Sequence, residues 1–210
     1  MKVLLVNGSP HPKGCTYTAL HLVGDELNKA GIETEDFWIG NKPVTGCIGC
    51  GWCREHHACH VQDTVNPFLE KAKTADGFVF GAPVHFASIA ASMAGFMDRA
   101  FFADQFGRLH CFAQKPGAAI VSARRAGTTA SLDVLNKYLF YAQMPIATSR
   151  YWNMVHGQTP EDVWKDTEGV QIMRVLGQNL AWLMKSLEAG EKAGVKKPEP
   201  EPRISTNFIR

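Results

Sequence analysis

The 210-residue sequence lacks several features that mark common classes of protein. It has no block of basic residues, and its 22 lysines and arginines are nearly balanced in charge by 20 acidic residues. Nucleic acid is therefore not an expected partner. No apolar stretch approaches the roughly 20 residues of a membrane span. The start, MKVLLVNGSP, lacks the length and the cleavage site of a signal peptide. We therefore expect a cytoplasmic protein that does not work at a membrane.

No internal repeat is visible, and neither a G-x-x-x-x-G-K-[ST] loop nor a G-x-G-x-x-G loop is present. The chain instead alternates two patterns. Short apolar runs bounded by turn residues predict strands, and apolar residues at helical spacing predict helices. The predicted strands cover residues 3–6, 33–39, 77–81, 117–122 and 145–149. The predicted helices cover residues 16–30, 67–74, 88–102, 128–143 and 166–187.

This alternation predicts an α/β fold whose parallel sheet is covered on both faces. Five strands fit the doubly wound order 2-1-3-4-5. With 45% hydrophobic residues, the chain is long enough for one buried domain and short for two. We predict a single domain over residues 1–188. Residues 189–210 contain KKPEPEPR, which predicts an extended tail or an arm around a partner subunit.

The loops after the first, third and fourth predicted strands should meet where such sheets bind ligands, at the carboxyl ends of the strands. The first loop, 7–18, combines Gly and Pro residues with the hydroxyls of Ser9, Thr16 and Thr18 beside a helix N-terminus. Hydroxyls and free backbone N–H groups in that position suit a phosphate. The alternative is that Ser and Thr only cap the helix.

The other two loops suit a planar, anionic ligand. Residues 82–88 place His85 and Phe86 behind Pro83, and an imidazole and an aromatic ring can line a flat ring system. Residues 122–128 contain Arg124 and Arg125, whose charges can neutralise an anionic flavin or a nicotinamide phosphate. Ordinary loop packing and a solvated, helix-capping loop are the respective alternatives.

Four cysteines fall within thirteen residues of the loop region 40–65, in the order C-x2-C-x2-C-x5-C. In a reducing compartment such a group indicates metal binding or redox chemistry rather than structural disulfides. The compact spacing is typical of ferredoxin-type iron–sulfur sites. Zinc bound with nearby histidines, a redox dithiol and free thiols stay open as alternatives. The four residues are Cys47, Cys50, Cys53 and Cys59.

Three segments carry a resemblance to a known family: GSPHPKGCTYT, CIGCGWCREHHAC and GAPVHFASIAASMAGFMDR. On these residues the chain resembles the flavodoxin-like NAD(P)H-dependent FMN reductases over residues 1–187. Within that group it is most similar to the iron–sulfur flavoproteins, whose cysteine spacing it matches. The resemblance implies an FMN cofactor, a [4Fe–4S] cluster on the four cysteines and assembly as homodimers or homotetramers.

The resemblance also implies roles for individual residues. His85, where relatives commonly carry Tyr, is the predicted proton donor beside the flavin. The residues implied to hold the FMN phosphate lie in the first loop: Ser9, Thr16, Tyr17 and Thr18. Pro10 and Cys15 of the same loop are also predicted to be in the FMN site. The residues implied to contact its ring system lie in the second and third loops: Pro83, Val84, His85, Phe86, Ser122, Arg124 and Gly127.

Together these patterns predict an FMN-dependent oxidoreductase. NAD(P)H or a reduced carrier is the expected electron donor. The expected acceptor is a quinone-like or other small molecule, or a redox protein, with the cluster as an intermediate carrier. Three alternatives stay open: a reductase without a cluster, a flavodoxin-like electron carrier or redox sensor without turnover, and a zinc-binding interaction module.

Overall fold

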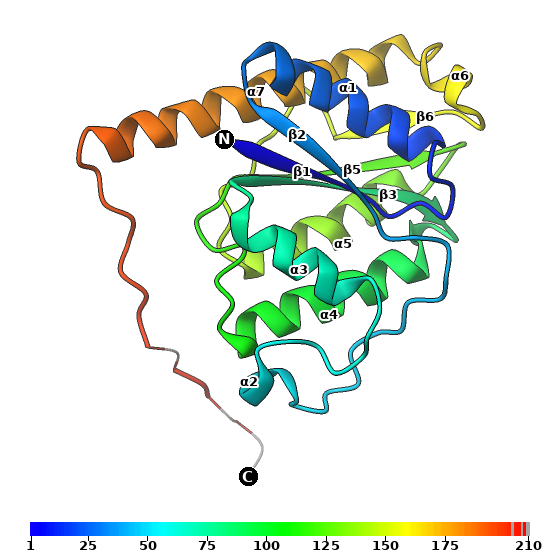
Figure 1. Ribbon diagram of the computed structural model, residues 1–210. Coiled ribbons are helices and arrows are strands. Elements are labelled where there is room, and N and C mark those ends of the chain that lie inside the picture. The colour runs from blue at the N-terminus through cyan, green and yellow to red at the C-terminus, as the bar shows by residue number, and fades with distance from the viewer. Residues whose placement is uncertain (203, 207, 209–210) are drawn as a thin grey trace.

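The computed structural model describes residues 1–202, 204–206 and 208, and there the chain forms a three-layer α/β/α sandwich (Figure 1). The strands are β1 (Lys2–Asn7), β2 (Glu33–Trp38), β3 (Gly77–His85), β4 (Ser88–Ile89), β5 (Gly117–Ala123) and β6 (Met154–His156). The helices are α1 (Cys15–Lys29), α2 (Cys53–His56), α3 (Val65–Thr74), α4 (Ala91–Gly107), α5 (Thr128–Tyr141), α6 (Pro160–Val163) and α7 (Thr167–Lys192).

Five parallel strands form the sheet in the order β2-β1-β3-β5-β6. This is the predicted doubly wound order for the five parallel strands. The short β4 was not predicted; it pairs antiparallel with the end of β3 and lies off this path. Consequently β1 and β3 lie at the centre of the sheet, and both of their carboxyl ends point to the same edge.

Alternate residues of each strand point to opposite faces of the sheet, and both faces are buried. On one face Val3 and Leu5 join the core formed with α1 and α7. On the other face Leu4 and Val6 join a core rich in phenylalanine, beneath α3, α4 and α5. Figure 1 shows one layer of helices on each face of the sheet.

The predicted strand at residues 145–149 is wrong, because the edge strand is split in two. Ile146 makes only an isolated bridge to Gly117, at the beginning of β5. The chain then leaves the sheet and returns as β6, which pairs with the end of β5 from Val121 onward. Just before β6, the buried side chain of Asn153 holds the chain against β5 by donating a 3.0 Å hydrogen bond to the carbonyl of Ala119.

Two predicted helix boundaries also shift. The predicted helix 88–102 begins instead at Ala91, after β4, and continues to Gly107. The last helix runs to Lys192, so the expected domain boundary at residue 188 falls inside α7. Among the described residues after 194 there is no regular structure, and residues 203, 207 and 209–210 of the predicted tail lie outside the described part. None of the described helices has the length and hydropathy to cross a membrane.

The cysteine-bearing segment leaves the end of β2 and passes along α4 before it reaches α2 (Figure 1). Its backbone lies directly on α4 at Gly95. A Cβ atom at this position would lie 2.7 Å from the carbonyl oxygen of Val44 and 2.9 Å from that of Thr45. Because only glycine permits this approach, α4 is the platform on which the cysteine-bearing segment is built.

Candidate functional site

A cavity of about 560 Å³ opens at the carboxyl ends of the central strands. Its wall combines the three predicted loops with a fourth segment that follows β6. The residues in the wall are His11, Pro12, Lys13, Gly14, Cys15, Thr16, Pro83, Val84, Ser122, Ala123, Arg124, Gly157, Gln158, Thr159 and Pro160. The cavity therefore lies at the sheet edge that the sequence indicated for a ligand.

The first loop is held in shape by its own side chains. The side-chain oxygen of Asn7 accepts a 3.0 Å hydrogen bond from the Ser9 amide, and its side-chain nitrogen donates a 3.1 Å bond to the carbonyl of Pro12. The Ser9 hydroxyl accepts a bond from the His11 amide. Helix α1 then begins at Cys15 without a side-chain cap. The cavity wall thus contains the start of a helix whose first backbone N–H groups suit an anionic ligand.

A buried contact joins the first and third loops. The hydroxyl oxygens of Thr16 and Ser122 lie 2.8 Å apart, and both residues are almost fully buried. Cys15 beside them is half-buried, and burial raises the pKa of its thiol, with a smaller contribution from the carboxylates of Asp162 and Glu161. The contact between Thr16 and Ser122 therefore fixes this part of the wall in position.

The structure places several predicted residues outside the cavity wall. Ser9 lies beneath the first loop, and the Thr18 hydroxyl bonds to the carbonyl of Gly14. The ring of Tyr17 lies against that of His21, with centroids 4.0 Å apart. The complete set of predicted ligand residues outside the wall is Ser9, Pro10, Tyr17, Thr18, His85, Phe86 and Gly127. Their roles stay predictions.

The second loop is a tight β-hairpin. Val84 and His85 of β3 pair with β4, which leaves Phe86 and Ala87 as the two turn residues. Both turn residues have positive φ, 49° and 58°, as a type I′ turn requires. Glycine and asparagine are the usual residues in such turns, so this turn is strained. The strained turn presents the Phe86 ring fully to solvent at the rim of the cavity.

Gly127 supports this hairpin from the third loop. Its φ of +95° favours glycine, and a Cβ atom there would lie only 2.6 Å from the Cα of Ala87 and 3.0 Å from the side chain of Val84. Gly127 therefore contacts the hairpin and does not line the cavity, and its predicted contact with the flavin stays a prediction.

The fourth wall segment, residues 157–160, was missed. Thr159 caps α6 in a reciprocal capping box with Asp162, and Pro160 occupies the first turn of the helix. The sequence Thr-Pro-Glu-Asp signals this helix start and would have located the segment. Lys13 was also left out of the predicted set, although it lies in the first loop.

The charge of the wall is positive. Lys13 and Arg124 both line the cavity, and none of the described residues in the wall is acidic. Arg125, next in sequence to Arg124, is not part of the wall. A cationic cavity beside a helix N-terminus favours a ligand with a phosphate group.

The four clustered cysteines lie apart from this cavity. All are free thiols: Cys47 and Cys50 are exposed, Cys53 is buried and Cys59 is half-buried. Burial raises the pKa of the Cys53 thiol, and Cys47, Cys50 and Cys59 nearby raise it further. Within the described residues, however, no three His, Cys, Asp or Glu side chains are arranged so that they could hold a metal ion.

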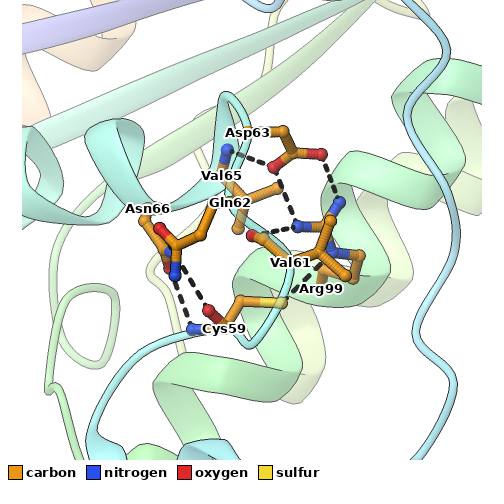
Figure 2. A network of polar contacts seen from close by, with 7 residues as sticks. All are labelled: Cys59, Val61, Gln62, Asp63, Val65, Asn66 and Arg99. Atoms are coloured by element: carbon orange, nitrogen blue, oxygen red, sulfur yellow. Dashed lines mark hydrogen bonds and ion pairs between the residues drawn. The ribbon is translucent and has the colours of Figure 1, made fainter.

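The segment that carries these cysteines is fastened to α4 at both ends of α2. The ring of His57 donates a 2.6 Å hydrogen bond to the carbonyl of Gly107, and the guanidinium of Arg54 lies over the ring of Phe106. Further along, Cys59 accepts a 3.3 Å hydrogen bond from Arg99 (Figure 2). Arg99 was not predicted as a site residue.

A doubly wound parallel sheet with a cationic cavity at its carboxyl edge defines a flavodoxin-like protein. Comparison with known proteins agrees: residues 1–159 match the family of NADPH-dependent FMN reductases, and the chain belongs to that family. It is 31% identical to an iron–sulfur flavoprotein of Methanocaldococcus jannaschii over 195 residues, which cover 90% of this chain and all of that protein.

Solved structures show the same fold. The structure of RosB with a bound 8-demethyl-8-formylriboflavin-5'-phosphate intermediate superposes with a TM-score of 0.71 at 14% identity, covering 100% of this chain and 92% of that one. The NAD(P)H:quinone oxidoreductase of Methanothermobacter marburgensis superposes with a TM-score of 0.65 at 18% identity, covering 86% and 96%. The predicted fold and the predicted family are confirmed.

The strained hairpin generates a stability prediction. Replacing its turn with the favoured pair, Phe86→Asn with Ala87→Gly, should raise the free energy of unfolding by about 1 kcal/mol, because both new residues accept positive φ. Urea unfolding of the cofactor-free protein measures the change. Phe86→Leu keeps the unfavourable turn and serves as the control, with no expected gain. Equal stability of all three proteins would show that the turn carries no strain.

Proposed function

We propose that this protein is an FMN-dependent oxidoreductase that also carries a [4Fe–4S] cluster. It takes electrons from NAD(P)H or a reduced carrier and passes them to a quinone-like molecule, another small molecule or a protein. The observation that carries the proposal is the cationic cavity at the carboxyl edge of the sheet, into which the uncapped start of α1 opens. Membership of the FMN reductase family supports it.

The residues of the cavity fit FMN in size and charge. A volume of about 560 Å³ lies within the range of pockets that hold small cofactors. In the proposed complex, the backbone N–H groups at the start of α1 and the side chain of Lys13 bind the phosphate. The hydroxyls of Thr16 and Ser122 already bond to each other, so they fix the two loops and leave the phosphate mainly to backbone donors.

The rest of the wall fits the flavin ring. Pro83 and Val84 offer an apolar edge at the end of β3, and the neighbouring hairpin presents the ring of Phe86 at the rim. Arg124 supplies positive charge from the third loop. FMN bound here would supply the hydride and electron chemistry, while the protein orients it and excludes water from one side.

The chemistry of the cysteine group fits an iron–sulfur cluster. Four free thiols in the ferredoxin-type spacing lie on one segment, and one of them already receives an N–H donor from a buried cation. Cys47, Cys50, Cys53 and Cys59 would hold the cluster. A cluster would supply one-electron steps, which suit exchange with a redox protein.

The contribution of Arg124 to FMN binding can be tested against Arg125, the next residue, as a matched control. Arg124→Ala should weaken FMN binding about tenfold, equivalent to about 1.4 kcal/mol, because a charged donor is lost from the cavity wall. Arg125→Ala removes the same charge outside the wall and should change FMN affinity little. Quenching of FMN fluorescence on titration with cofactor-free protein measures both affinities. Equal effects of the two substitutions would argue against the proposed orientation of the ligand.

The cluster is tested by metal analysis of protein purified without oxygen. The expected result is flavin absorbance with a broad shoulder, together with roughly four iron and four sulfide ions per chain. Cys59→Ser should lower the iron content and leave the flavin peaks. Cys111→Ser is the control, since Cys111 is buried against Leu69, away from the group. Flavin without iron would remove the cluster from the proposal, and stoichiometric zinc would replace it with a zinc site.

His85 is the proposed proton donor, although it lies at the exposed end of β3 rather than in the cavity wall. His85→Phe should slow NAD(P)H-driven turnover about a hundredfold, the usual scale of general acid catalysis, while the FMN content stays unchanged. Steady-state rates on FMN-saturated protein measure the effect. Unchanged turnover would remove His85 from the reaction.

A further inference from the structure

Arg99 is a charged residue in the core of the protein. It lies near the middle of α4, is 2% exposed and is among the largest fully buried side chains of the described residues. A buried guanidinium is costly unless its donors are paired. Its contacts therefore show what holds this charge in the interior.

All three nitrogens of the Arg99 guanidinium have partners (Figure 2). Nη1 and Nη2 donate bonds of 2.6 and 2.8 Å to the two carboxylate oxygens of Asp63, and Nη2 also donates a 3.1 Å bond to the carbonyl of Val61. Nε donates a 3.3 Å bond to the sulfur of Cys59. Because Asp63 occupies the fork of the guanidinium, Nε is left to face the sulfur.

The ion pair is fully formed in this environment. Burial alone would raise the pKa of Asp63, but the hydrogen bonds from Arg99 and from the Val65 amide outweigh burial, and its pKa lies below the ordinary value. Burial likewise opposes the charge on Arg99, and its bonds to Asp63 and Cys59 more than compensate. The two parallel hydrogen bonds between the guanidinium and the carboxylate are the geometry of an ion pair, and this pair lies beside the sulfur.

The backbone of Cys59 is also held by a side chain, that of Asn66. Its amide donates a 2.8 Å bond to the side-chain oxygen of Asn66, and its carbonyl accepts a 2.9 Å bond from the side-chain nitrogen of the same residue (Figure 2). Within the described residues, the sulfurs of Cys47 and Cys50 receive no hydrogen bond. Cys59 differs from these two cysteines, because both its sulfur and its backbone are held by side chains before any metal binds.

We propose that Arg99 is a positioning residue that holds Cys59 as a cluster ligand and sets the reduction potential of the cluster, with Asp63 as its counter-charge. This inference rests on the proposed [4Fe–4S] cluster. Reduction adds one negative charge to a cluster, and an N–H donor or a positive charge at a ligand sulfur stabilises the reduced state. Arg99 therefore raises the potential, and the carboxylate of Asp63 lowers it.

Arg99 and Asp63 should shift the midpoint potential of the cluster in opposite directions. A purely structural role of the pair would not predict opposite shifts. Arg99→Gln should lower the midpoint potential of the cluster, because the cation is lost and the carboxylate stays. Asp63→Asn should raise it, because the cation loses its counter-charge. Each change should alter the reduction equilibrium constant about tenfold, which is about 59 mV for a one-electron couple. Arg99→Lys, which keeps the charge but not the fork, should restore part of the loss.

The experiment is a reductive titration of the intact holoprotein without oxygen, followed by the electron paramagnetic resonance signal of the reduced cluster. Iron is measured on every sample. The matched control is Arg54→Gln, which removes an exposed positive charge next in sequence to Cys53, where the guanidinium lies over the ring of Phe106. The potential of this control should stay close to that of the wild type.

Opposite shifts for Arg99→Gln and Asp63→Asn support the inference. Unchanged potentials, or shifts of the same sign, in samples with normal iron content overturn it and leave the cluster in place. If the Arg99→Gln variant loses its iron, the test depends on the Asp63→Asn variant. A raised midpoint potential in that variant supports the inference, and an unchanged one overturns it. Wild-type protein without iron overturns the proposed cluster itself and this role with it, so the two failures are told apart by the iron content.

Discussion

The site depends on one constraint, that strands in a parallel sheet all run in the same direction. Every loop that follows a strand then lies at the same edge, however far apart the loops are in sequence. Here β1, β3, β5 and β6 end together and enclose the cavity. The positive charge of the cavity follows from the same geometry, because it brings together the start of α1, Lys13 and Arg124.

The cysteine-bearing segment depends on a different interaction, the ion pair between the buried Arg99 and the partly buried Asp63. Replacing such a pair with apolar side chains often leaves a protein equally stable, so stability alone does not account for it. Unlike apolar packing, the ion pair fixes the direction in which the N–H groups of Arg99 point. The fork of Arg99 faces Asp63, and the remaining N–H faces the sulfur of Cys59. This specificity of direction is what a metal ligand requires.

The sequence was sufficient for features that depend on local patterns. Apolar runs predicted four of the five parallel strands and the order of the sheet, and the spacing of Gly, Pro and hydroxyl residues predicted the first loop. The fifth strand was predicted at residues 145–149, whereas the structure forms it at Met154–His156. Features that depend on tertiary contacts were missed. The turn at Phe86 and Ala87 opposes the local preference of both residues, and the support from Gly127 comes from another loop. Arg99 has the pattern of an exposed helix residue, and its partner Asp63 lies 36 positions away.

Helix α4 connects the two proposed redox sites. It begins directly after the hairpin at the rim of the cavity, and Arg99, eight residues after Ala91, reaches Cys59. At 1.5 Å per residue this separation is about 12 Å along one straight element. Gly95, between them, lets the cysteine-bearing segment lie directly on the helix. Helix α4 therefore links the hairpin that follows β3 to the residue that bonds to Cys59, so one structural element lies beside both proposed redox sites.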